Sequence, residues 1–202
     1  MLIIVCAGLC RRVMRVIAGT FRSRPLAAPK GMNTRPTSDR LRETLFNVLS
    51  QRTEGARFVD LYAGSGAVGI EAISRGAEQV WFAEKAPSAV KAIRENLAAL
   101  KIVSGYALEA RGVSVLLEEL ARRGEKVDLV FLDPPYEEEE EYERTLKFLG
   151  SRGGSVLAED GRVIAEHHHK TILAEQYGAL ERVRVLKQGD AALSFFAVKP
   201  KE

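Results

Sequence analysis

Cysteine is scarce in this sequence. The only two in 202 residues, Cys6 and Cys10, precede every segment that predicts folded structure. We therefore expect no disulfide framework, and a reducing cytoplasm suits the chain. The apolar start, residues 1–9, is far too short to cross a bilayer and lacks a preceding basic region, so neither a membrane span nor a secretion signal is expected.

A net excess of charge is also nearly absent, because the whole chain carries only +3. The distribution is uneven, with eleven Lys and Arg against three Asp and Glu in residues 11–57, a local +8, and −5 over residues 58–202. A basic front segment on a mildly acidic body predicts a polyanionic partner for that segment, and a solvated surface is the alternative. A hairpin in this segment would carry Arg15, Arg22 and Arg24.

The length and composition suit one domain with a small appendage. Met14 begins a sequence that would make a natural translation start, so residues 1–13 are expected to be a non-native or disordered extension. Residues 14–53 would form the basic hairpin and a helix, and residues 54–202 the main domain.

The expected helix begins after Ser38, since Thr37 or Ser38 can cap it. Its buried stripe, at helical spacing, consists of Leu41, Leu45, Phe46 and Leu49. Arg40 and Arg42 are expected to point away from that stripe.

From Phe58 onward, short apolar runs alternate with helical patterns, which is typical of a doubly wound parallel sheet. The sequence predicts strands near 58–62, 79–84, 105–110, 127–132 and 161–166, and helices near 67–75, 87–101, 113–123 and 139–150. Two further apolar runs, 180–187 and 192–198, flank residues 188–190, whose Gln-Gly-Asp sequence predicts a hairpin turn. A parallel sheet closed by an antiparallel hairpin is the arrangement of class I methyltransferases.

The run at 127–132 stops at Asp133, Pro134, Pro135 and Tyr136, which is how a buried strand ends over a ligand crevice. The prolines stiffen the turn and leave carbonyls free, Asp133 adds a carboxylate acceptor, and Tyr136 adds a flat face for a nucleobase. Two acceptors beside a stacking ring suit an exocyclic amine about to attack an electrophilic methyl group. The simpler interpretation is a proline-rich turn with a half-buried tyrosine.

Methyl transfer to a pyrimidine carbon needs a cysteine nucleophile in the core, and the two cysteines lie outside it. Direct attack by a substrate nitrogen needs no such residue. The sequence therefore favours amine methylation over carbon methylation.

Residues 60–69, Asp-Leu-Tyr-Ala-Gly-Ser-Gly-Ala-Val-Gly, follow the first strand and open a helix. Glycines let the backbone approach a ligand, and the G-x-G-x-x-G spacing also permits a dinucleotide site. Asp60 suits the cationic amino group of a methionine moiety better than a pyrophosphate. Glu84, at the end of the next strand, can accept both ribose hydroxyls in either kind of site.

Residues 14–199 resemble the bacterial 16S rRNA guanine-N2 methyltransferases, which act on the small ribosomal subunit. The segments that carry the resemblance are 15–19, 34–47, 60–69 and 133–136, of which 34–47 is the most specific. The resemblance implies an α/β, Rossmann-like class I methyltransferase fold. Its mostly parallel seven-stranded sheet would have helices on both faces, a C-terminal antiparallel hairpin and a small N-terminal hairpin and helix.

The resemblance also implies S-adenosylmethionine as cofactor and 16S rRNA as partner, for a cytoplasmic monomer without a metal. The expected catalytic residues are Asp133, Pro134 and Tyr136. The residues expected at the cofactor are Thr34, Arg35, Thr37, Asp60, Tyr62, Ala63, Gly64, Ser65, Gly66, Glu84, Lys85, Arg111 and Gly112. The residues expected on the RNA are Arg15, Arg22, Arg24, Arg35 and Arg40.

One position departs from the family pattern. Such enzymes place an acidic or amide side chain after the third strand to hold the adenine amine, whereas this chain has Arg111, which cannot accept that bond. Adenine could instead be held by the backbone at Gly112 or by Glu109.

Elsewhere, His167, His168 and His169 invite a metal interpretation, but consecutive strand residues alternate faces and cannot all point at one ion.

The sequence thus predicts transfer of a methyl group to the N2 of a guanine in 16S rRNA. Methylation of an adenine or cytosine amine in DNA would use the same turn, but would need a recognition domain for which the chain has no room. Methylation of a protein glutamine would be expected to need Asn in place of Asp133. A non-catalytic dinucleotide-binding or RNA-binding module is the remaining alternative.

Overall fold

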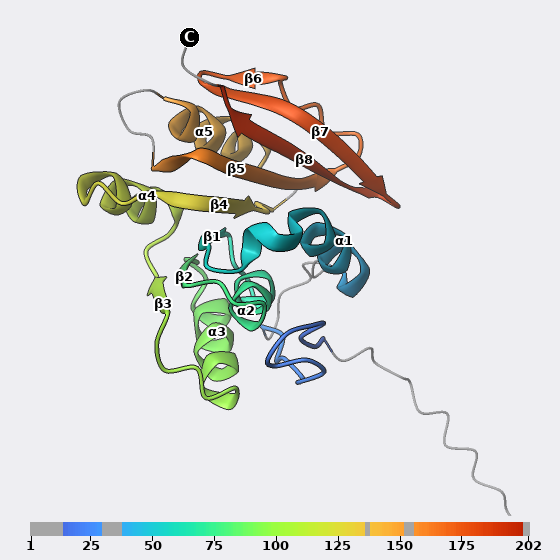
Figure 1. Ribbon diagram of the computed structural model, residues 1–202, viewed down its shortest axis with the longest axis vertical. Helices are drawn as coiled ribbons and strands as arrows, with labels where there is room; N and C mark the ends of the chain where they lie inside the picture. The colour runs from blue at the N-terminus through green and yellow to red at the C-terminus, as the bar shows by residue number, and fades with distance from the viewer. Residues whose placement is uncertain (1–13, 30–37, 136–137, 152–155, 200–202) are drawn as a thin grey trace, which may run out of the picture.

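The computed structural model describes residues 14–29, 38–135, 138–151 and 156–199 (Figure 1). The expectation for residues 1–13 lies outside these ranges. The described helices are α1 (Asp39–Leu49), α2 (Ala67–Ser74), α3 (Pro87–Ala99), α4 (Val113–Arg122) and α5 (Glu139–Gly150), with a 3-10 helix η1 (Ser50–Thr53). The strands are β1 (Arg57–Leu61), β2 (Gln79–Ala83), β3 (Tyr106–Glu109), β4 (Val127–Leu132), β5 (Leu157–His168), β6 (Gln176–Tyr177), β7 (Leu180–Gln188) and β8 (Ala191–Val198).

The strands form one sheet in the order β3-β2-β1-β4-β5-β8-β7-β6. Strands β1 to β5 pair in parallel, and β8 returns antiparallel to both β5 and β7. The predicted α/β class and the terminal hairpin are confirmed, with Gly189 in the left-handed region (φ 63°) at the hairpin turn. The sheet has eight strands instead of the expected seven, because the two-residue strand β6 adds an edge to β7.

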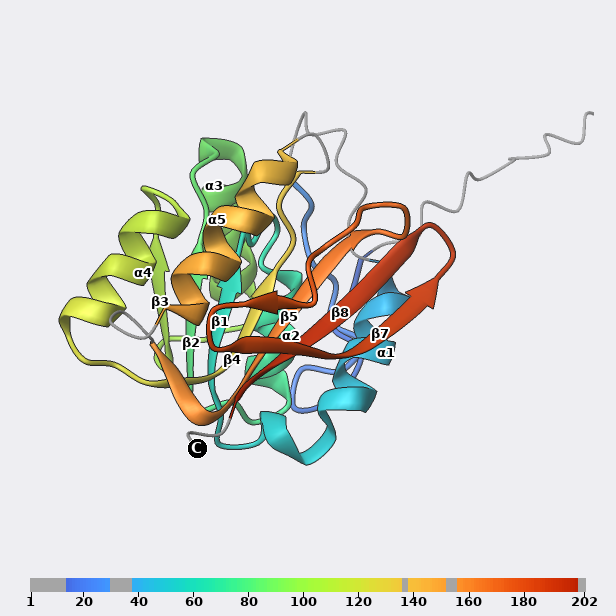
Figure 2. The same ribbon diagram turned by 90° about the horizontal axis from the view of Figure 1, so that it is seen from above.

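Helices cover both faces of the sheet, as Figures 1 and 2 show. Helices α1, α2 and α3 share one apolar cluster with Phe58, and α4 and α5 share a second cluster with Val59 and Leu61. Alternation along β1 sends successive side chains to opposite faces, so a strand buried on both sides reads as an almost continuous apolar run. None of the described helices has the length and apolar character needed to cross a membrane.

Strand β5 is twice as long as predicted. Glu159 and Asp160 resemble a loop in sequence, yet the strand continues through them, with an irregular register against β4 between Val127 and Leu129. Its other end runs on to His168 because β8 pairs with it beyond the last residue of β4. Pairing with β8 therefore extends the polar end of the strand, whereas its added start lies beside β4, where Leu157 pairs with Val127.

Residues 14–29, which we call the arm, form a smaller version of the predicted hairpin. A single antiparallel bridge joins Arg15 and Pro25, supported by main-chain bonds from Val16 N to Arg24 O (2.9 Å) and Leu26 N to Met14 O (2.8 Å). Val16 and Leu26 are buried in the cluster that contains α1, α2 and α3. The arm is thus packed on the same face of the sheet as those helices (Figure 1).

Helix α1 begins as predicted, with Ser38 Oγ accepting from Leu41 N at 3.2 Å, and the four residues of the predicted apolar stripe are buried. The expectation for Arg42 was wrong. Its side chain is fully buried and donates to Ala67 O (3.3 Å), Arg15 O (2.8 Å) and Asp39 Oδ1 (2.6 Å). Helical spacing shows which residues share a face, but it does not show that a neighbouring segment will cover an arginine.

Candidate functional site

The acidic residues singled out from the sequence lie at one edge of the sheet. The parallel register pairs Leu61 with Ala83 and with Leu132, so the residues that follow β1, β2 and β4 leave the sheet side by side. Glu84 and Asp133 directly follow two of these strands, and Asp60 is the penultimate residue of β1. This edge is where open α/β sheets bind ligands.

Residues 62–66, which we call the glycine loop, connect β1 to α2. Gly64 and Gly66 have φ values of 55° and 77°, and Gly66 N donates to Ala63 O at 2.7 Å. None of the described residues would lie within 4 Å of a Cβ added to Gly64, so they leave the loop backbone open at this point. A ligand can therefore approach the main chain closely at this point.

Gly69 serves a different purpose from the loop glycines. A Cβ at this position would lie 2.2 Å from Phe82 Cε1, so the missing side chain lets α2 pack closely against β2. The G-x-G-x-x-G spacing thus combines loop glycines that let a ligand approach with a third glycine that lets the helix pack closely.

Asp60 is buried, with 1% exposure, and its Oδ2 accepts from Gly69 N at 2.8 Å. Burial raises the pKa of Asp60 to about 8, Gly69 N–H opposes this shift, and the nearby Glu84 adds to it. A carboxyl held in this state would ionise when a cation binds beside it.

Glu84 is also largely buried, and main-chain amides hold both of its oxygens. Gly64 N donates to Oε2 and Ala86 N donates to Oε1, each at 2.8 Å. The carboxylate is therefore fixed against the glycine loop, and each oxygen keeps acceptor capacity for a hydroxyl.

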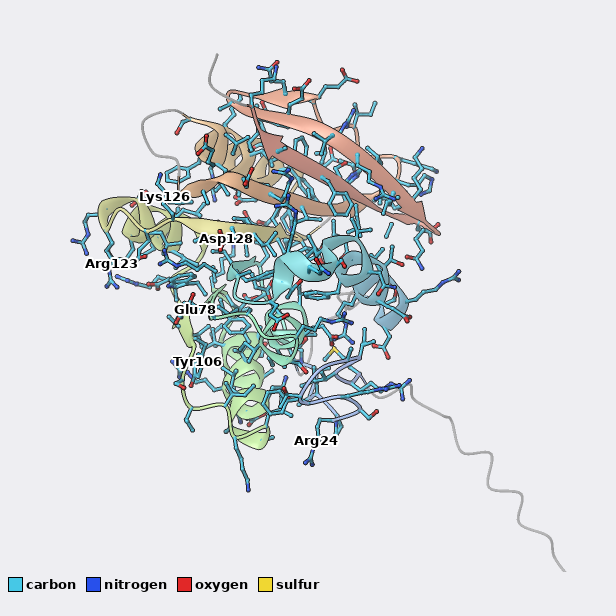
Figure 3. All side chains as sticks on the ribbon, viewed as in Figure 1. Arg24, Glu78, Tyr106, Arg123, Lys126 and Asp128 are labelled. Carbon is cyan, nitrogen blue, oxygen red and sulfur yellow. The ribbon has the colours of Figure 1, made fainter. Side chains whose placement is uncertain are left out.

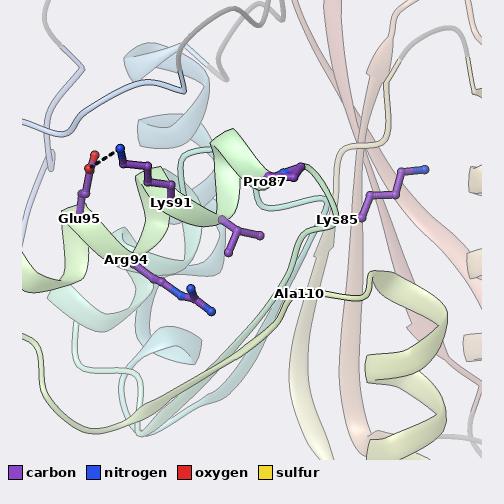
Figure 4. A pocket seen from close by; sticks show the side chains of 7 residues that line it. Lys85, Pro87, Lys91, Arg94, Glu95 and Ala110 are labelled. Atoms are coloured by element: carbon purple, nitrogen blue, oxygen red, sulfur yellow. Dashed lines mark ion pairs between the residues drawn. The ribbon is translucent and has the colours of Figure 1, made fainter.

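Lys85 lies beside a groove of about 510 Å³ between α3 and the end of β3 (Figure 4). The groove is lined by Lys85, Pro87, Val90, Lys91, Arg94, Glu95 and Ala110. Lys85 Nζ lies 3.7 Å from Glu138 Oε2, and Lys91 pairs with Glu95. A Cβ on Gly112 would lie 3.7 Å from Lys85 Cβ, so these two predicted cofactor residues are neighbours.

Arg111, which departs from the family pattern, is bound to Glu109. Its backbone N and its Nε donate to Glu109 Oε1 at 2.8 Å, and its Nη2 donates to Oε2 at 2.7 Å. These bonds lower the pKa of Glu109, and the side-chain hydrogen bonds of Arg111 are the main cause. Arg111 therefore supplies three donors to the Glu109 carboxylate, and Gly112 and Glu109 remain the two expected contacts for adenine.

Tyr62, expected at the cofactor, directs its hydroxyl to α5. The hydroxyl donates to Glu141 Oε2 at 2.6 Å and lies 3.1 Å from Thr145 Oγ1. Burial raises the pKa of Tyr62 above its usual value, and the bond to Glu141 adds to this shift. Tyr62 thus ties the glycine loop to the helix that follows the 133–136 turn, a link that sequence reasoning missed.

The turn after β4 presents Asp133, which is partly buried, and Pro134, which is buried. The next proline is exposed, and its carbonyl accepts from Glu138 N at 2.8 Å, which helps to fix the turn ahead of α5. Tyr136 lies outside the described residues, as do Thr34, Arg35 and Thr37. The two residues expected to hold the amine, Asp133 and Pro134, therefore lie at the same sheet edge as the glycine loop.

The arginines expected on RNA are exposed wherever the structure describes them, namely at Arg15, Arg22, Arg24 and Arg40. Figure 3 shows Arg24 at the outer side of the arm. Arg15 Nε lies 3.8 Å from Asp39 Oδ2, a surface ion pair of small energetic weight. The predicted Arg35 lies outside the described residues.

The three histidines do not share one point. His167 is buried and its Nε2 lies 2.9 Å from Ser194 Oγ, whereas His168 and His169 gather with Asp190, their ligand atoms within 4.8 Å of one another. Local hydrogen bonds already use this cluster, since Lys170 N donates to His168 Nδ1 and His169 Nδ1 lies 3.2 Å from Asp190 O. We assign it no metal.

The family described as conserved hypothetical protein 95 matches residues 14–197 of the chain. The chain belongs to this family. "Putative rRNA methyltransferase YlbH" of Bacillus subtilis (strain 168) is 36% identical over 171 residues, which are 85% of this chain and 91% of the relative. Ribosomal RNA small subunit methyltransferase D of Escherichia coli (strain K12) is 38% identical over 123 residues, 61% of this chain and 60% of that relative.

Solved structures agree with the family assignment. The structure described as "Putative methyltransferase yhhF from Escherichia coli" matches with a TM-score of 0.76 and 30% identity, over 94% of this chain and 99% of that one. The resemblance and the fold class read from the sequence are therefore confirmed. The names of these family relatives do not say which base nitrogen is methylated.

Proposed function

We propose that this protein transfers a methyl group from S-adenosylmethionine to the exocyclic N2 of a guanine in 16S rRNA, acting in the cytoplasm as a monomer. The observation that carries the proposal is the position of Asp133 and Pro134 at the sheet edge that also holds Glu84 and the glycine loop. Family relatives named rRNA methyltransferases support rRNA as the substrate class.

The residues at this edge fit the cofactor. The open space above Gly64 admits a ligand against the main chain, and the fixed Glu84 carboxylate suits a pair of ribose hydroxyls. Asp60, a buried carboxyl with a raised pKa that would lose its proton beside a cation, suits a cationic amino group. When bound, S-adenosylmethionine supplies an electrophilic methyl group on a sulfonium.

Asp133 and the Pro134 carbonyl would accept the two hydrogens of the guanine amine. Accepting these hydrogen bonds would favour a pyramidal nitrogen. Its lone pair would then no longer be delocalised into the ring, so the nitrogen could attack the methyl group. Tyr136 would stack on the base after it leaves its surroundings. As the new nitrogen–carbon bond forms, the bond from the methyl carbon to sulfur would break with its electron pair left on sulfur, which would give S-adenosylhomocysteine, and the amine proton would pass to Asp133 or to solvent.

The test is methyl transfer from radiolabelled S-adenosylmethionine to small subunits that lack the modification, followed by mapping of the labelled nucleotide. We expect label in one guanine of 16S rRNA, recovered as N2-methylguanine after digestion. Label in an adenine, or in DNA supplied at equal concentration, would overturn the assignment. Naked 16S rRNA in a parallel reaction distinguishes free RNA from the assembled particle as substrate.

Asp60 gives cofactor binding a pH dependence. Since its pKa is raised to about 8, the carboxyl is mostly protonated at pH 7 before a cation binds, and it loses its proton when the cation lowers that pKa. We expect S-adenosylhomocysteine to release about one proton at pH 7 and to bind more tightly as the pH rises from about 6 to 7.5. Calorimetry in two buffers of different ionisation enthalpy measures this release. Asp60→Asn should release none, and equal release by both proteins would contradict the assignment.

The arm arginines should contribute to RNA affinity mainly through phosphate contacts. Arg22→Ala and Arg24→Ala are each expected to weaken binding to all RNA sequences alike and to reduce the slope of log Kd against log salt by about 1. Filter binding or fluorescence anisotropy across a salt series measures both quantities. Arg123→Ala, on the α4 side of the molecule (Figure 3), is the matched control, and an equal loss there would argue against a specific role for the arm.

A further inference from the structure

Four buried polar side chains have no part in the chemistry proposed above. They are Arg42, Glu71, Ser74 and Asn96, each with 3% exposure or less. Burying such groups is costly unless they are hydrogen-bonded. All four bond to the main chain of the arm, so the structure uses them to hold this segment.

Asn96, on α3, joins the arm to the glycine loop. Its Oδ1 accepts from Ala27 N at 2.7 Å, and its Nδ2 donates to Ala27 O at 3.0 Å and to Ser65 O at 2.9 Å. The carboxamide thus uses both of its amide hydrogens and pairs with both polar groups of the Ala27 main chain. One side chain sets the distance between the end of the arm and the loop.

The other end of the arm is tied to the same place. Ser65 Oγ lies 3.5 Å from Met14 Sδ, and Arg42 spans from Arg15 O to Ala67 O, two residues after Ser65. Both ends of the arm are therefore held against residues 65–67.

The middle of the arm is docked on α2. Glu71 accepts from Ile17 N (2.7 Å) and Ala18 N (3.0 Å), and Ser74 Oγ accepts from Phe21 N (2.9 Å). A Cβ on Gly19 would lie 1.8 Å from Ser74 O, so the close approach requires glycine. These bonds use the arm's main chain and leave its arginine side chains exposed.

We infer that Asn96 is a positioning residue, which makes the arm and the glycine loop one unit and thereby sets the place of RNA relative to the methyl donor. The inference rests on the proposed function. Asn96 is 3% exposed and its side chain bonds to Ser65 and Ala27, so its role would be exerted through these two residues. The charges that attract RNA and the carboxylates that suit the cofactor do not depend on it, so its loss should separate binding from transfer.

Two variants test this role. Asn96→Ala removes all three bonds, and Asn96→Asp keeps the volume and the acceptor for Ala27 N but loses the donors to Ser65 O and Ala27 O. We expect single-turnover methyl transfer to fall roughly 10- to 100-fold, the loss that a misplaced reactant produces. Affinities for S-adenosylhomocysteine and for RNA should stay within about threefold of the original protein. Asn47→Asp, the same chemical change at an exposed position of α1, should leave all three values unchanged.

Hydrogen exchange gives a second readout that does not require activity. In the original protein, S-adenosylhomocysteine should slow exchange of the arm amides at Ile17, Ala18 and Ala27 as well as the loop amides. In Asn96→Ala the loop should still respond while Ala27 no longer does, and Ile17 and Ala18, which donate to Glu71, should keep their response as internal controls. An Ala27 amide that responds equally in both proteins, or a transfer loss fully explained by weaker binding, would overturn the inference. Failure of the original protein to methylate RNA would instead count against the proposed function, and the exchange comparison would still decide the role of Asn96.

Discussion

Replacing Asp133 with alanine should lower kcat for methyl transfer roughly 10²- to 10³-fold, the usual cost of removing one preorganised hydrogen-bonding group from a transition state. Asp133 follows β4 at the ligand-binding edge and would accept a hydrogen from the amine as the nitrogen becomes pyramidal. Cofactor affinity should change little, because Asp60 and Glu84 remain in place. Single-turnover transfer and calorimetry with S-adenosylhomocysteine measure the two effects separately.

Asp133→Asn separates the acceptor role from the charge. The amide keeps one acceptor oxygen, so we expect a smaller loss than in Asp133→Ala. Glu140→Gln, an exposed acid in the turn of α5 nearest this site, is the control and should retain full activity. If Asp133→Ala kept more than about a third of the original rate, or lost cofactor binding in the same proportion, the amine-holding role would be wrong.

The sheet and the positions of its acidic residues follow from the sequence because parallel strands impose a simple geometry. Each apolar run ends at a polar residue, and parallel pairing brings those ends to one edge. That rule predicts the neighbourhood of Glu84 and Asp133 without any knowledge of tertiary contacts. It does not predict the length of β5, because that strand is extended at its end by the antiparallel partner β8 and at its start by an irregular pairing with β4.

The contacts within the site are less accessible to sequence reasoning, since they join side chains from elements distant along the chain. Tyr62 reaches Glu141 on α5, and Asn96 reaches Ala27 in the arm. A glutamate in an acidic run and an asparagine in a helix carry no local signal of such partners. Arg111 is a partial exception, because Glu109 two residues earlier was available as a carboxylate for it.

Arg42→Met should lower the free energy of unfolding by about 2–4 kcal/mol. The guanidinium is fully buried, and its loss would leave the Arg15 carbonyl without this donor and would remove one of two donors to the Ala67 carbonyl, which also accepts within α2. Each buried acceptor left unpaired costs about 1–3 kcal/mol. Asp39 contributes less to the destabilisation, because its side chain is 45% exposed and can be hydrated once Arg42 is gone. Arg42 Nε has no partner among the described residues, so its removal breaks no bond. The expected loss of stability is therefore below the upper limit for breaking a buried ion pair.

For a chain of this length, the melting temperature should fall by roughly 5–15 °C in a thermal unfolding experiment. Arg40→Met makes the same chemical change at an exposed position of α1 and should shift the stability by no more than about 0.5 kcal/mol. A melting temperature of Arg42→Met equal to that of Arg40→Met would mean that the cost of burying the guanidinium cancels its bonds. Arg42 would then hold the arm in register without stabilising the fold, because the hydrogen-bond geometry at Arg15 and Ala67 would remain specific even where its net free energy is zero.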